Sequence, residues 1–258
     1  MKIQYISDLH LEFSQNNNFL MKSPIKPKGD ILILAGDIVL FSKLDNHLDF
    51  FNYCSDNFKF TYWVPGNHEY YHSDVCLPLS KVNKTGILNE KIKDNVFLIN
   101  NVAIKHDNIK FIFSTLWTKI NPTNQFWIER SMSDFIVIKY NGDYFNINHC
   151  NDLHDKSISF IKTELEEKDF TGKIIVATHH VPTILNYPPK YKGDLLNEAF
   201  AVELHDFILD SKINYWIYGH HHANITPFKI GKTKLITNQL GYVHCRECEF
   251  SNKIITVK

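Results

Sequence analysis

Short runs of β-branched and aromatic residues recur along this chain, and each predicts a β-strand. In several of them apolar residues follow one another without alternation, which is typical of strands covered on both faces. The predicted strands are residues 2–7, 30–36, 60–64, 108–117, 173–178, 214–219, 234–238 and 253–257. Helices are predicted between them over residues 43–57, 73–90, 152–168 and 198–211. This alternation predicts a layered α/β fold, and without a repeat or a low-complexity linker we expect one domain over residues 1–258.

Residues 117–150 interrupt the alternation. The segment is rich in aromatic residues, has no clean helical or strand period, and follows the end of a predicted strand. Active-site loops of α/β folds lie at such strand ends. Two interpretations stay open: a surface excursion that packs its own aromatic side chains, and a cap that faces a substrate.

Composition and charge exclude several partners. Lys plus Arg and Asp plus Glu are equal at 28 each, so no overall field recruits a membrane or long duplex nucleic acid. The arginines are Arg130 and Arg246 alone, so bidentate clamps for phosphate are scarce. The N-terminal residues lack the pattern of a secretory signal, and the five cysteines form an odd, scattered set. We therefore expect a cytoplasmic protein with reduced thiols.

Residues that can carry chemistry cluster directly after five of the predicted strands. The segments are SDLH after the first strand, GD after the second, PGNHE after the third, THH after residues 173–178 and GHHH after residues 214–219. Loops at the carboxyl ends of strands meet at one crevice in such folds. Turn residues scattered by chance explain any one of these segments but not all five. We expect the five segments to form one site.

In this order the segments resemble the motifs of the calcineurin-like metallophosphoesterases. The matching residues are Asp8, His10, Gly36, Asp37, Gly66 to Glu69, His179, Gly219, His220 and His222. The resemblance covers nearly the whole chain. It implies a four-layer αββα sandwich with a binuclear metal centre at its edge, and the activity of a metal-dependent phosphoric ester hydrolase.

The resemblance also implies a set of metal ligands. One metal would be held by Asp8, His10, Asp37 and His222, and the other by Asn67, His179 and His220, with Asp37 bridging both. Imidazole, carboxylate and amide groups without a thiolate suit two divalent or mixed-valence transition metals, with manganese, iron, zinc and nickel as candidates. Two such cations against two carboxylates leave excess positive charge, so a chain with few arginines can still bind phosphate.

Neighbouring histidines need separate assignments. If the histidine triplet is extended, His220 and His222 share one face and His221 points away from it. We therefore expect His221 at the rim of the site or behind the ligands. In THHVP the resemblance makes His179 the ligand and gives His180 a supporting role.

Because the resemblance assigns Asn67 to a metal, its neighbour His68 is expected to be free for catalysis. The resemblance implies that His68 stabilises the transferring phosphoryl group or protonates the leaving oxygen, with a metal-bridging hydroxide as the nucleophile. Glu69 either orients this loop or is a solvated carboxylate.

Two motifs of this chain differ from those of one branch of the family, and the difference narrows the range of expected substrates. Protein serine/threonine phosphatases continue GD with VDRG and place an arginine before GNHE, whereas this chain reads GDIVLFS and VPGNHE. The sequence therefore predicts a small metallophosphoesterase that cleaves phosphodiesters or phosphomonoesters, and not a protein phosphatase. The alternatives are a diesterase that processes nucleotides or nucleic acids, and a non-catalytic scaffold on the same fold. Because every motif position is filled, the scaffold is disfavoured.

A small, nucleotide-like diester is the favoured substrate. A monoester dianion usually needs arginine forks, which this chain lacks. The second substituent of a diester could stack on aromatic side chains. The candidates for stacking are Trp117, Phe126, Trp127 and Tyr140, together with the loop 186–194. Lys190 or Lys192 could instead replace the missing arginines and favour a monoester.

Overall fold

The computed structural model describes residues 1–76, 87–247 and 251–257. Within these residues the first sheet has six strands, and its four central strands run parallel. Its order is β14 (Ile254–Thr256), β1 (Lys2–Ile6), β2 (Ile31–Ala35), β3 (Phe60–Val64), β5 (Val96–Asn100) and β4 (Leu88–Lys93). The edge strands β14 and β4 are antiparallel to their neighbours. All five residues of β2 are buried, as expected for a strand covered on both faces.

The second sheet repeats this plan. Over the same described ranges its order is β12 (Phe228–Ile230), β13 (Thr233–Thr237), β11 (Tyr215–Tyr218), β10 (Lys173–Thr178), β7 (Ile109–Ser114) and β6 (Val102–His106). The four central strands are again parallel, and β12 and β6 are antiparallel edges. Since parallel strands end at the same edge of a sheet, the loops after β1, β2, β3, β10 and β11 can converge.

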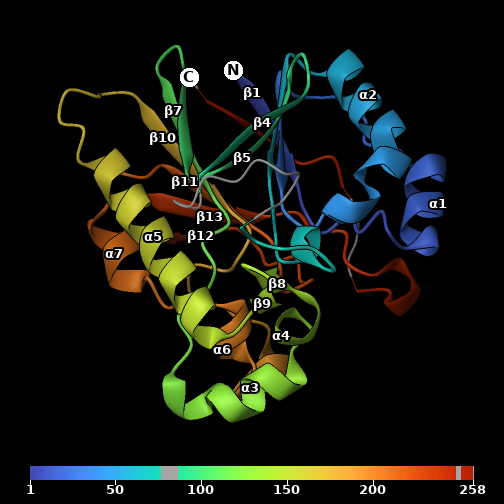
Figure 1. The fold of residues 1–258 in the computed structure, drawn as a ribbon. Coiled ribbons are helices and arrows are strands. Elements are labelled where there is room, and N and C mark those ends of the chain that lie inside the picture. The colour runs from blue at the N-terminus through green and yellow to red at the C-terminus, as the bar shows by residue number, and fades with distance from the viewer. Residues whose placement is uncertain (77–86, 248–250, 258) are drawn as a thin grey trace.

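Helices cover the outer face of each sheet (Figure 1). On the first sheet lie η1 (Phe41–His47) and α2 (Leu48–Asn57), with α1 (Ser14–Lys22) beside them, and on the second lie α5 (Ile147–Leu165) and α7 (His205–Asp210). One apolar cluster, which includes Ile33, Tyr62 and Phe111, fills the space between the sheets. Two further clusters lie between each sheet and its helices. The layers are therefore helix, sheet, sheet and helix, and the predicted αββα sandwich is confirmed.

The 117–150 segment lies at one end of the sandwich, at the bottom of Figure 1. Its elements are η4 (Pro122–Asn124), α3 (Gln125–Ser131), α4 (Asp134–Val137), β8 (Lys139–Tyr140) and β9 (Asp143–Tyr144). The rings of Phe135 and Phe145 stack with centroids 5.7 Å apart, and Trp117 lies 5.0 Å from Phe145. The segment thus packs its own aromatic side chains, and residues 131–133 also line a cavity at the candidate site.

Two predicted helices differ from the structure. Of the predicted helix 73–90, Asp74 forms an isolated β-bridge with Lys139 and residues 75–76 form a turn. Residues 88–90 begin β4, and residues 77–86 lie outside the described part of the chain. The predicted helix 198–211 is divided into α6 (Asn197–Phe200) and α7 because Ala201 forms a β-bridge with Val181.

Outside residues 117–150, four strands and one helix of the described part of the chain have no counterpart in the prediction. They are β4, β5, β6, β12 and α1. Between β5 and β6 a single residue, Asn101, carries the chain from the first sheet to the second. Its φ of 52° is a left-handed conformation, which asparagine adopts more readily than most residues. Because β5 and β6 follow each other with only Asn101 between them, the sequence gives little sign that the chain changes sheet here.

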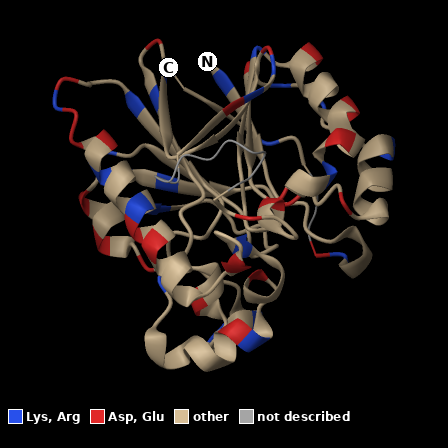
Figure 2. Cartoon of the chain, in the orientation of Figure 1, with Lys and Arg blue, Asp and Glu red and all other residues tan. Residues whose placement is uncertain are grey.

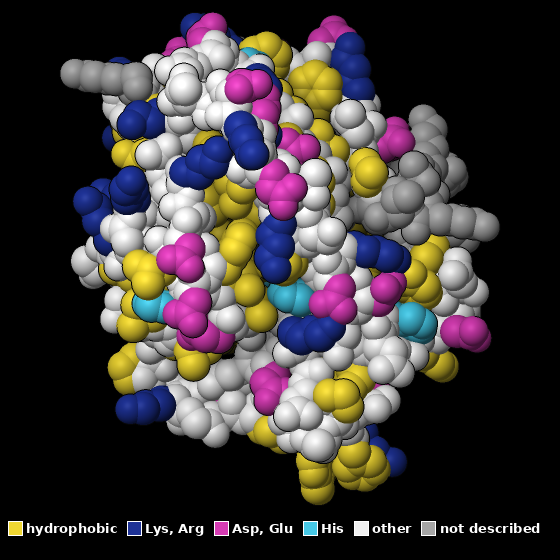
Figure 3. All heavy atoms as spheres, turned by 90° about the vertical axis from the view of Figure 1, so that its left-hand side faces the viewer, with side chains coloured by type: hydrophobic (Ala, Val, Ile, Leu, Met, Phe, Trp, Pro, Cys, Tyr) yellow, Lys and Arg dark blue, Asp and Glu magenta, His cyan; other side chains and the backbone are white. Residues whose placement is uncertain are grey.

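Charges of both signs are interspersed over the chain (Figure 2), and the face that carries α5 and α7 shows the same mixture (Figure 3). This distribution agrees with the equal numbers of acidic and basic residues. Among the described residues, no helix is both long enough and apolar enough to span a membrane.

Candidate metal centre

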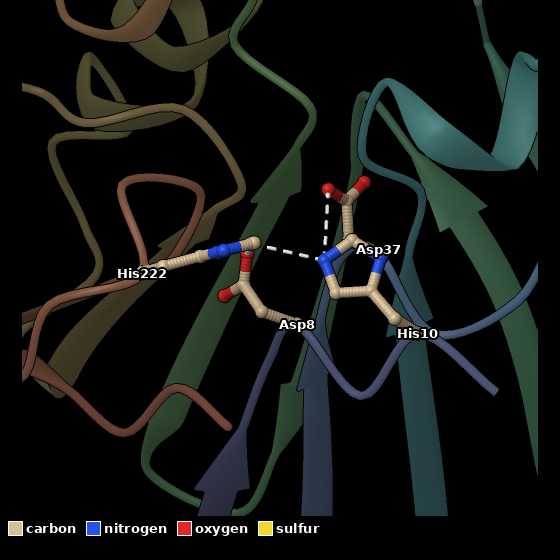
Figure 4. Close-up of side chains that lie close together, drawn as sticks. All are labelled: Asp8, His10, Asp37 and His222. Carbon is tan, nitrogen blue, oxygen red and sulfur yellow. Dashed lines mark hydrogen bonds and ion pairs between the residues drawn. The ribbon is translucent and has the colours of Figure 1, made fainter. Parts of the chain in front are cut away.

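The first group of predicted ligands comes from the ends of three strands. Asp8 and His10 follow β1, Asp37 follows β2, and His222 follows β11. Their side chains point toward one another (Figure 4), with ligand atoms that all lie within 4.8 Å of each other. His10 Nε2 lies 2.9 Å from His222 Nε2 and 3.8 Å from Asp37 Oδ2, and His222 Nε2 lies 3.4 Å from Asp8 Oδ1. The structure therefore brings the four residues together.

The second group lies beside the first and shares Asp37 with it. Asp37, His179 and His220 form a cluster with ligand atoms again within 4.8 Å of each other. His179 Nε2 lies 3.3 Å from Asp37 Oδ1 and 3.1 Å from His220 Nδ1. Asn67 completes the group, with Oδ1 3.2 Å from His179 Nε2. One carboxylate is therefore common to two adjacent sets of N and O donors.

These donors fit transition-metal cations. Two pairs of imidazole nitrogens lie close together, His10 with His222 at 2.9 Å and His179 with His220 at 3.1 Å. At these distances the lone pairs repel each other unless a proton or a cation lies between the two nitrogens. Burial lowers the pKa of His179, but the charge of Asp37 outweighs burial and raises the pKa to about 9. For His222 burial is likewise outweighed by Asp8 and Glu247, which raise its pKa to about 10. The buried carboxylates thus attract positive charge to the centre of both groups.

Most of the predicted ligands have an uncommon backbone conformation. The φ angles are 58° at Asp8, 47° at His10, 55° at Asp37, 80° at His220 and 46° at His222. Left-handed conformations of residues other than glycine are rare and cost about 1–3 kcal/mol each. Such strain is typical of functional sites, where the surrounding structure holds it in place.

The structure separates the histidines of the triplet as predicted, but the predicted extended conformation is wrong. His220 and His222 lie in the two clusters, and His221 does not. However, both flanking histidines are left-handed, so the triplet is not an extended segment. His221 is 3% exposed and accepts a hydrogen bond from Gln239 Nε2 at 2.8 Å. Burial lowers the pKa of His221 to about 4, so it stays neutral.

His180 lies behind the predicted ligand His220. Its ring centroid is 4.3 Å from that of His220, and its Nδ1 lies 3.1 Å from the carbonyl oxygen of Thr115. Burial and, to a lesser extent, the neighbouring His179 lower the pKa of His180 to about 3. A neutral His180 can donate its Nδ1 proton to this carbonyl and pack against His220.

Two motif positions need glycine because their backbone lies too close to predicted ligands for a side chain to fit. A Cβ atom at Gly66 would overlap Asp37 Oδ1 and the His179 ring. One at Gly219 would lie 2.7 Å from Asp8 Oδ2. The backbone of both loops therefore passes directly against predicted ligands, and a side chain there would displace them.

Glu69 orients its loop rather than facing solvent. It is fully buried and accepts four hydrogen bonds of 2.7–2.9 Å from N–H groups. The donors are the backbone of Asp37, Ile38 and Gly66 and the indole of Trp63. Of the two roles left open for Glu69, the structure supports the first.

His68 lies at the edge of the first group, with its ring held on several sides. Its Nδ1 lies 3.1 Å from Glu12 Oε1 and its Nε2 lies 3.3 Å from the Tyr242 hydroxyl. Its ring stacks on Tyr71 at 4.1 Å. The backbone N–H of His68 donates to Asp37 Oδ1 at 3.0 Å. Because the Glu12 carboxylate can only accept from Nδ1–H, Nε2 is the ring nitrogen left to act in the cavity.

Three acidic residues at the site carry no signal in the sequence. Glu12 Oε1 lies 3.2 Å from His10 Nδ1, Glu247 Oε2 lies 2.6 Å from His222 Nδ1, and Asp134 accepts from Asn67 Nδ2 at 2.8 Å. Each thus contacts a predicted ligand on its outer side, and such contacts fix ligand orientation. Only Glu12, two residues after His10, lies near a motif.

A cavity of about 350 Å³ opens on these residues. Its aromatic lining consists of Tyr71, Tyr187, Tyr191, Phe200 and Tyr242, and its acidic lining consists of Asp37, Asp194 and Glu247. None of the described residues that line it is lysine or arginine.

The aromatic residues predicted for stacking are mostly elsewhere. Trp117 is buried in the core, Tyr140 stacks on His149, and Phe126 and Trp127 are exposed on α3. The loop 186–194 does line the cavity, through Tyr187, Tyr191 and Asp194. The segment has no regular pattern of apolar residues, so its sequence could not show which aromatic side chains pack in the core and which line the cavity.

Comparisons with known proteins find similar proteins over most of the chain. The family model described as calcineurin-like phosphoesterase matches residues 1–224. An uncharacterized protein of Acanthamoeba polyphaga mimivirus is 33% identical over 274 residues, covering 95% of this chain and 92% of its own. Among solved structures, a phosphopantetheinyl hydrolase from Mycobacterium tuberculosis has a TM-score of 0.65 at 14% identity, covering 95% and 90% of the two chains. A dimetal phosphatase from Danio rerio has a TM-score of 0.55 at 13% identity, covering 93% and 87%.

Proposed function

The chain belongs to the calcineurin-like phosphoesterase family of metal-dependent hydrolases, and from this premise we propose that it is a binuclear phosphoesterase with a preference for small phosphodiesters. The observation that carries the proposal is the shared position of Asp37. This buried carboxylate belongs to both groups of donors, with His68 hydrogen-bonded to it through the backbone.

The residues that would hold the metals are those of the two groups. Asp8, His10, Asp37 and His222 would bind one, and Asp37, Asn67, His179 and His220 the other. When bound, two divalent metals supply Lewis acidity toward the phosphate oxygens and lower the pKa of a water molecule. Manganese, iron, zinc and nickel all match these ligand types.

The chain itself supplies the proton for the leaving oxygen. His68 lines the cavity, and Glu12 holds the ring through Nδ1, which leaves Nε2 as the nitrogen that can act there. An imidazolium in this position can donate a proton to the leaving oxygen or a hydrogen bond to the phosphoryl group. Tyr242, 3.3 Å from Nε2, limits rotation of the ring.

The preference for a diester follows from the charges of the cavity. A diester carries one negative charge and a monoester carries two, and the described lining has acidic groups without lysine or arginine. The Lys190 ammonium lies 4.4 Å from the centre of the Tyr191 ring, and Lys192 lines a different cavity. Neither lysine is among the residues that line this cavity. The tyrosines can stack on the second, nucleotide-like substituent.

The test compares two chromogenic substrates. With Mn²⁺ added, kcat/KM for bis(p-nitrophenyl) phosphate should exceed that for p-nitrophenyl phosphate. Tyr191→Ala should raise KM for the diester about tenfold and leave the monoester nearly unchanged, because one stacking contact is lost. The exposed Tyr144→Ala is the matched control. A clear monoester preference in the wild-type protein would overturn the proposed substrate class.

A further inference from the structure

Asp134 is a buried carboxylate that the 117–150 segment inserts beside the centre. It begins α4, is 3% exposed, and lies far from every sequence motif. Its Oδ1 accepts two hydrogen bonds, from Asn67 Nδ2 at 2.8 Å and from the Tyr71 hydroxyl at 2.7 Å. One oxygen atom thus contacts a predicted metal ligand and the ring that stacks on His68.

We propose that Asp134 is a positioning residue that sets the amide orientation of Asn67 and the ring position of His68. The inference rests on the proposed function, because it assigns Asn67 to a metal and His68 to catalysis. It gives the 117–150 segment a role inside the centre as well as at the cavity wall.

The contact with Asn67 selects one of two amide orientations. A side-chain amide has a donor end and an acceptor end, and a carboxylate oxygen attracts the donor end. With Nδ2 bound to Asp134, Oδ1 of Asn67 is turned toward His179 Nε2, 3.2 Å away. The reversed amide would place two oxygens together at Asp134 and present N–H groups where a cation would bind. Asp134 therefore keeps the metal-binding atom of Asn67 facing the centre.

The contact with Tyr71 acts on His68. The Tyr71 ring lies parallel to the His68 ring, with an interplanar angle of 23°, and its hydroxyl is fixed by Asp134. Glu12 holds His68 from a different direction, through Nδ1. One contact therefore supports the face of the imidazole and the other its edge, which leaves little freedom for Nε2 in the cavity.

The backbone joins the same two parts of the chain. His72 N donates to Val137 O at 3.0 Å, Val75 N donates to Lys139 O at 2.8 Å, and Lys139 N donates to Ser73 O at 2.9 Å. The loop after His68 is therefore attached to the end of α4 and to β8. The segment that lines the cavity with residues 131–133 is the same one that orients Asn67.

Mn²⁺ binding to metal-free protein, measured by calorimetry, tests the contact with Asn67. Asp134→Leu should weaken one of the two Mn²⁺ sites by about 10–100-fold, the usual effect of losing a group that orients a ligand. Asp134→Asn should stay within a few-fold of wild type, because an amide oxygen can accept both hydrogen bonds at the Oδ1 position. Asp134→Ala carries the same expectation as Asp134→Leu and replaces it if the leucine variant does not fold.

The matched control is Glu129→Leu. Glu129 is an acidic residue of the same segment that accepts from Ile147 N at 2.9 Å and Gln125 Nε2 at 3.1 Å, within the segment and the start of α5. Both Mn²⁺ sites should keep their affinity in this variant. Unchanged Mn²⁺ binding in Asp134→Leu, equal losses in Asp134→Leu and Asp134→Asn, or an equal loss in Glu129→Leu would each overturn the proposal.

Tyr71→Phe tests the contact with His68 separately. The variant keeps the stacking ring and loses the hydroxyl, so kcat should fall several-fold while KM and both Mn²⁺ affinities stay unchanged. An unchanged kcat would show that Asp134 does not set the ring position of His68 through Tyr71. If wild-type protein binds two Mn²⁺ but cleaves no phosphate ester, the proposed function fails, whereas the comparison of Mn²⁺ affinities still decides the role of Asp134.

Discussion

At the scale of single residues, the centre combines buried charge with strained backbone. Asp8, His10 and Asp37 have positive φ angles, and backbone hydrogen bonds from Asp8 N to Gly36 O and from His10 N to Asp37 O hold the first two loops together. Strain of this kind persists only where the surroundings over-determine it. These loop contacts hold the donor atoms in place.

Substitution of His68 should lower the rate of hydrolysis without affecting metal binding. His68→Ala should keep two metals per chain, because Asn67 and not His68 belongs to the donor groups. The rate on an alkyl phosphodiester should fall by about 10²–10⁴-fold as proton donation is lost. The loss should be smaller for a nitrophenyl ester, since nitrophenolate leaves without a proton. Steady-state rates on the two substrates, with elemental analysis of bound metal, check this.

An alkyl phosphodiester cleaved equally fast by His68→Ala and by wild type would contradict the assigned role. His205, a partly exposed residue of α7 that does not line the cavity, provides the control substitution.

The residue scale also shows what a motif can and cannot predict. The positions of Asp8, His179 and His222 were predictable because each carries a distinctive chemical group next to a strand end. Asp134 and Glu247 were not, because a single carboxylate in an irregular segment looks like any solvated one. Their roles come from burial and partners, which only the folded chain provides.

At the scale of elements, the site is made by loops at the carboxyl ends of parallel strands. Glu69 fastens two of these loops together, because its carboxylate accepts from Asp37 N and Ile38 N after β2 and from Gly66 N after β3. Trp63 Nε1, from β3 itself, is its fourth donor. The separation of the loops therefore depends on one buried carboxylate.

Glu69→Gln should lower the free energy of unfolding, measured by urea denaturation. A glutamine amide places N–H groups against N–H donors, at a cost of about 1–3 kcal/mol for each donor left unsatisfied. The exposed Glu166→Gln, at the end of α5, should change stability by less than about 0.5 kcal/mol. Equal stability of Glu69→Gln and wild type would show that the four hydrogen bonds do not fasten the loops.

Most strands with consecutive apolar residues were predicted, although β5, VFLIN, was missed, and charged or very short elements were not predicted. β2, β3 and β10 are buried strands whose β-branched and aromatic runs are unambiguous. The sequence of β4, LNEKIK, has half of its residues charged, because this edge strand faces solvent. α1, SQNNNFLMK, buries a polar residue, Asn16, whose side chain donates to the carbonyls of Leu9 and Gly241. Helical periodicity of apolar residues cannot reveal such a helix.

At the scale of the whole molecule, a chain of zero net charge concentrates its functional charge in one place. Both signs are interspersed along the chain (Figure 2) and on the face shown in Figure 3, while Asp8 and Asp37 are buried together between the ends of the two sheets. Each sheet supplies part of the centre: β1, β2 and β3 belong to one, and β10 and β11 to the other. The geometry of both donor groups therefore depends on how the two sheets are positioned relative to each other.

Titration of metal-free protein with Mn²⁺, with bound metal and hydrolysis of bis(p-nitrophenyl) phosphate measured at each step, tests the central claim most directly. We expect two Mn²⁺ per chain, with activity that appears only as both sites fill. Asp37→Ala should weaken both sites and abolish activity, because the shared carboxylate contributes to each donor group. Binding of one Mn²⁺ or none at saturation, or full activity with a single equivalent, would contradict the account.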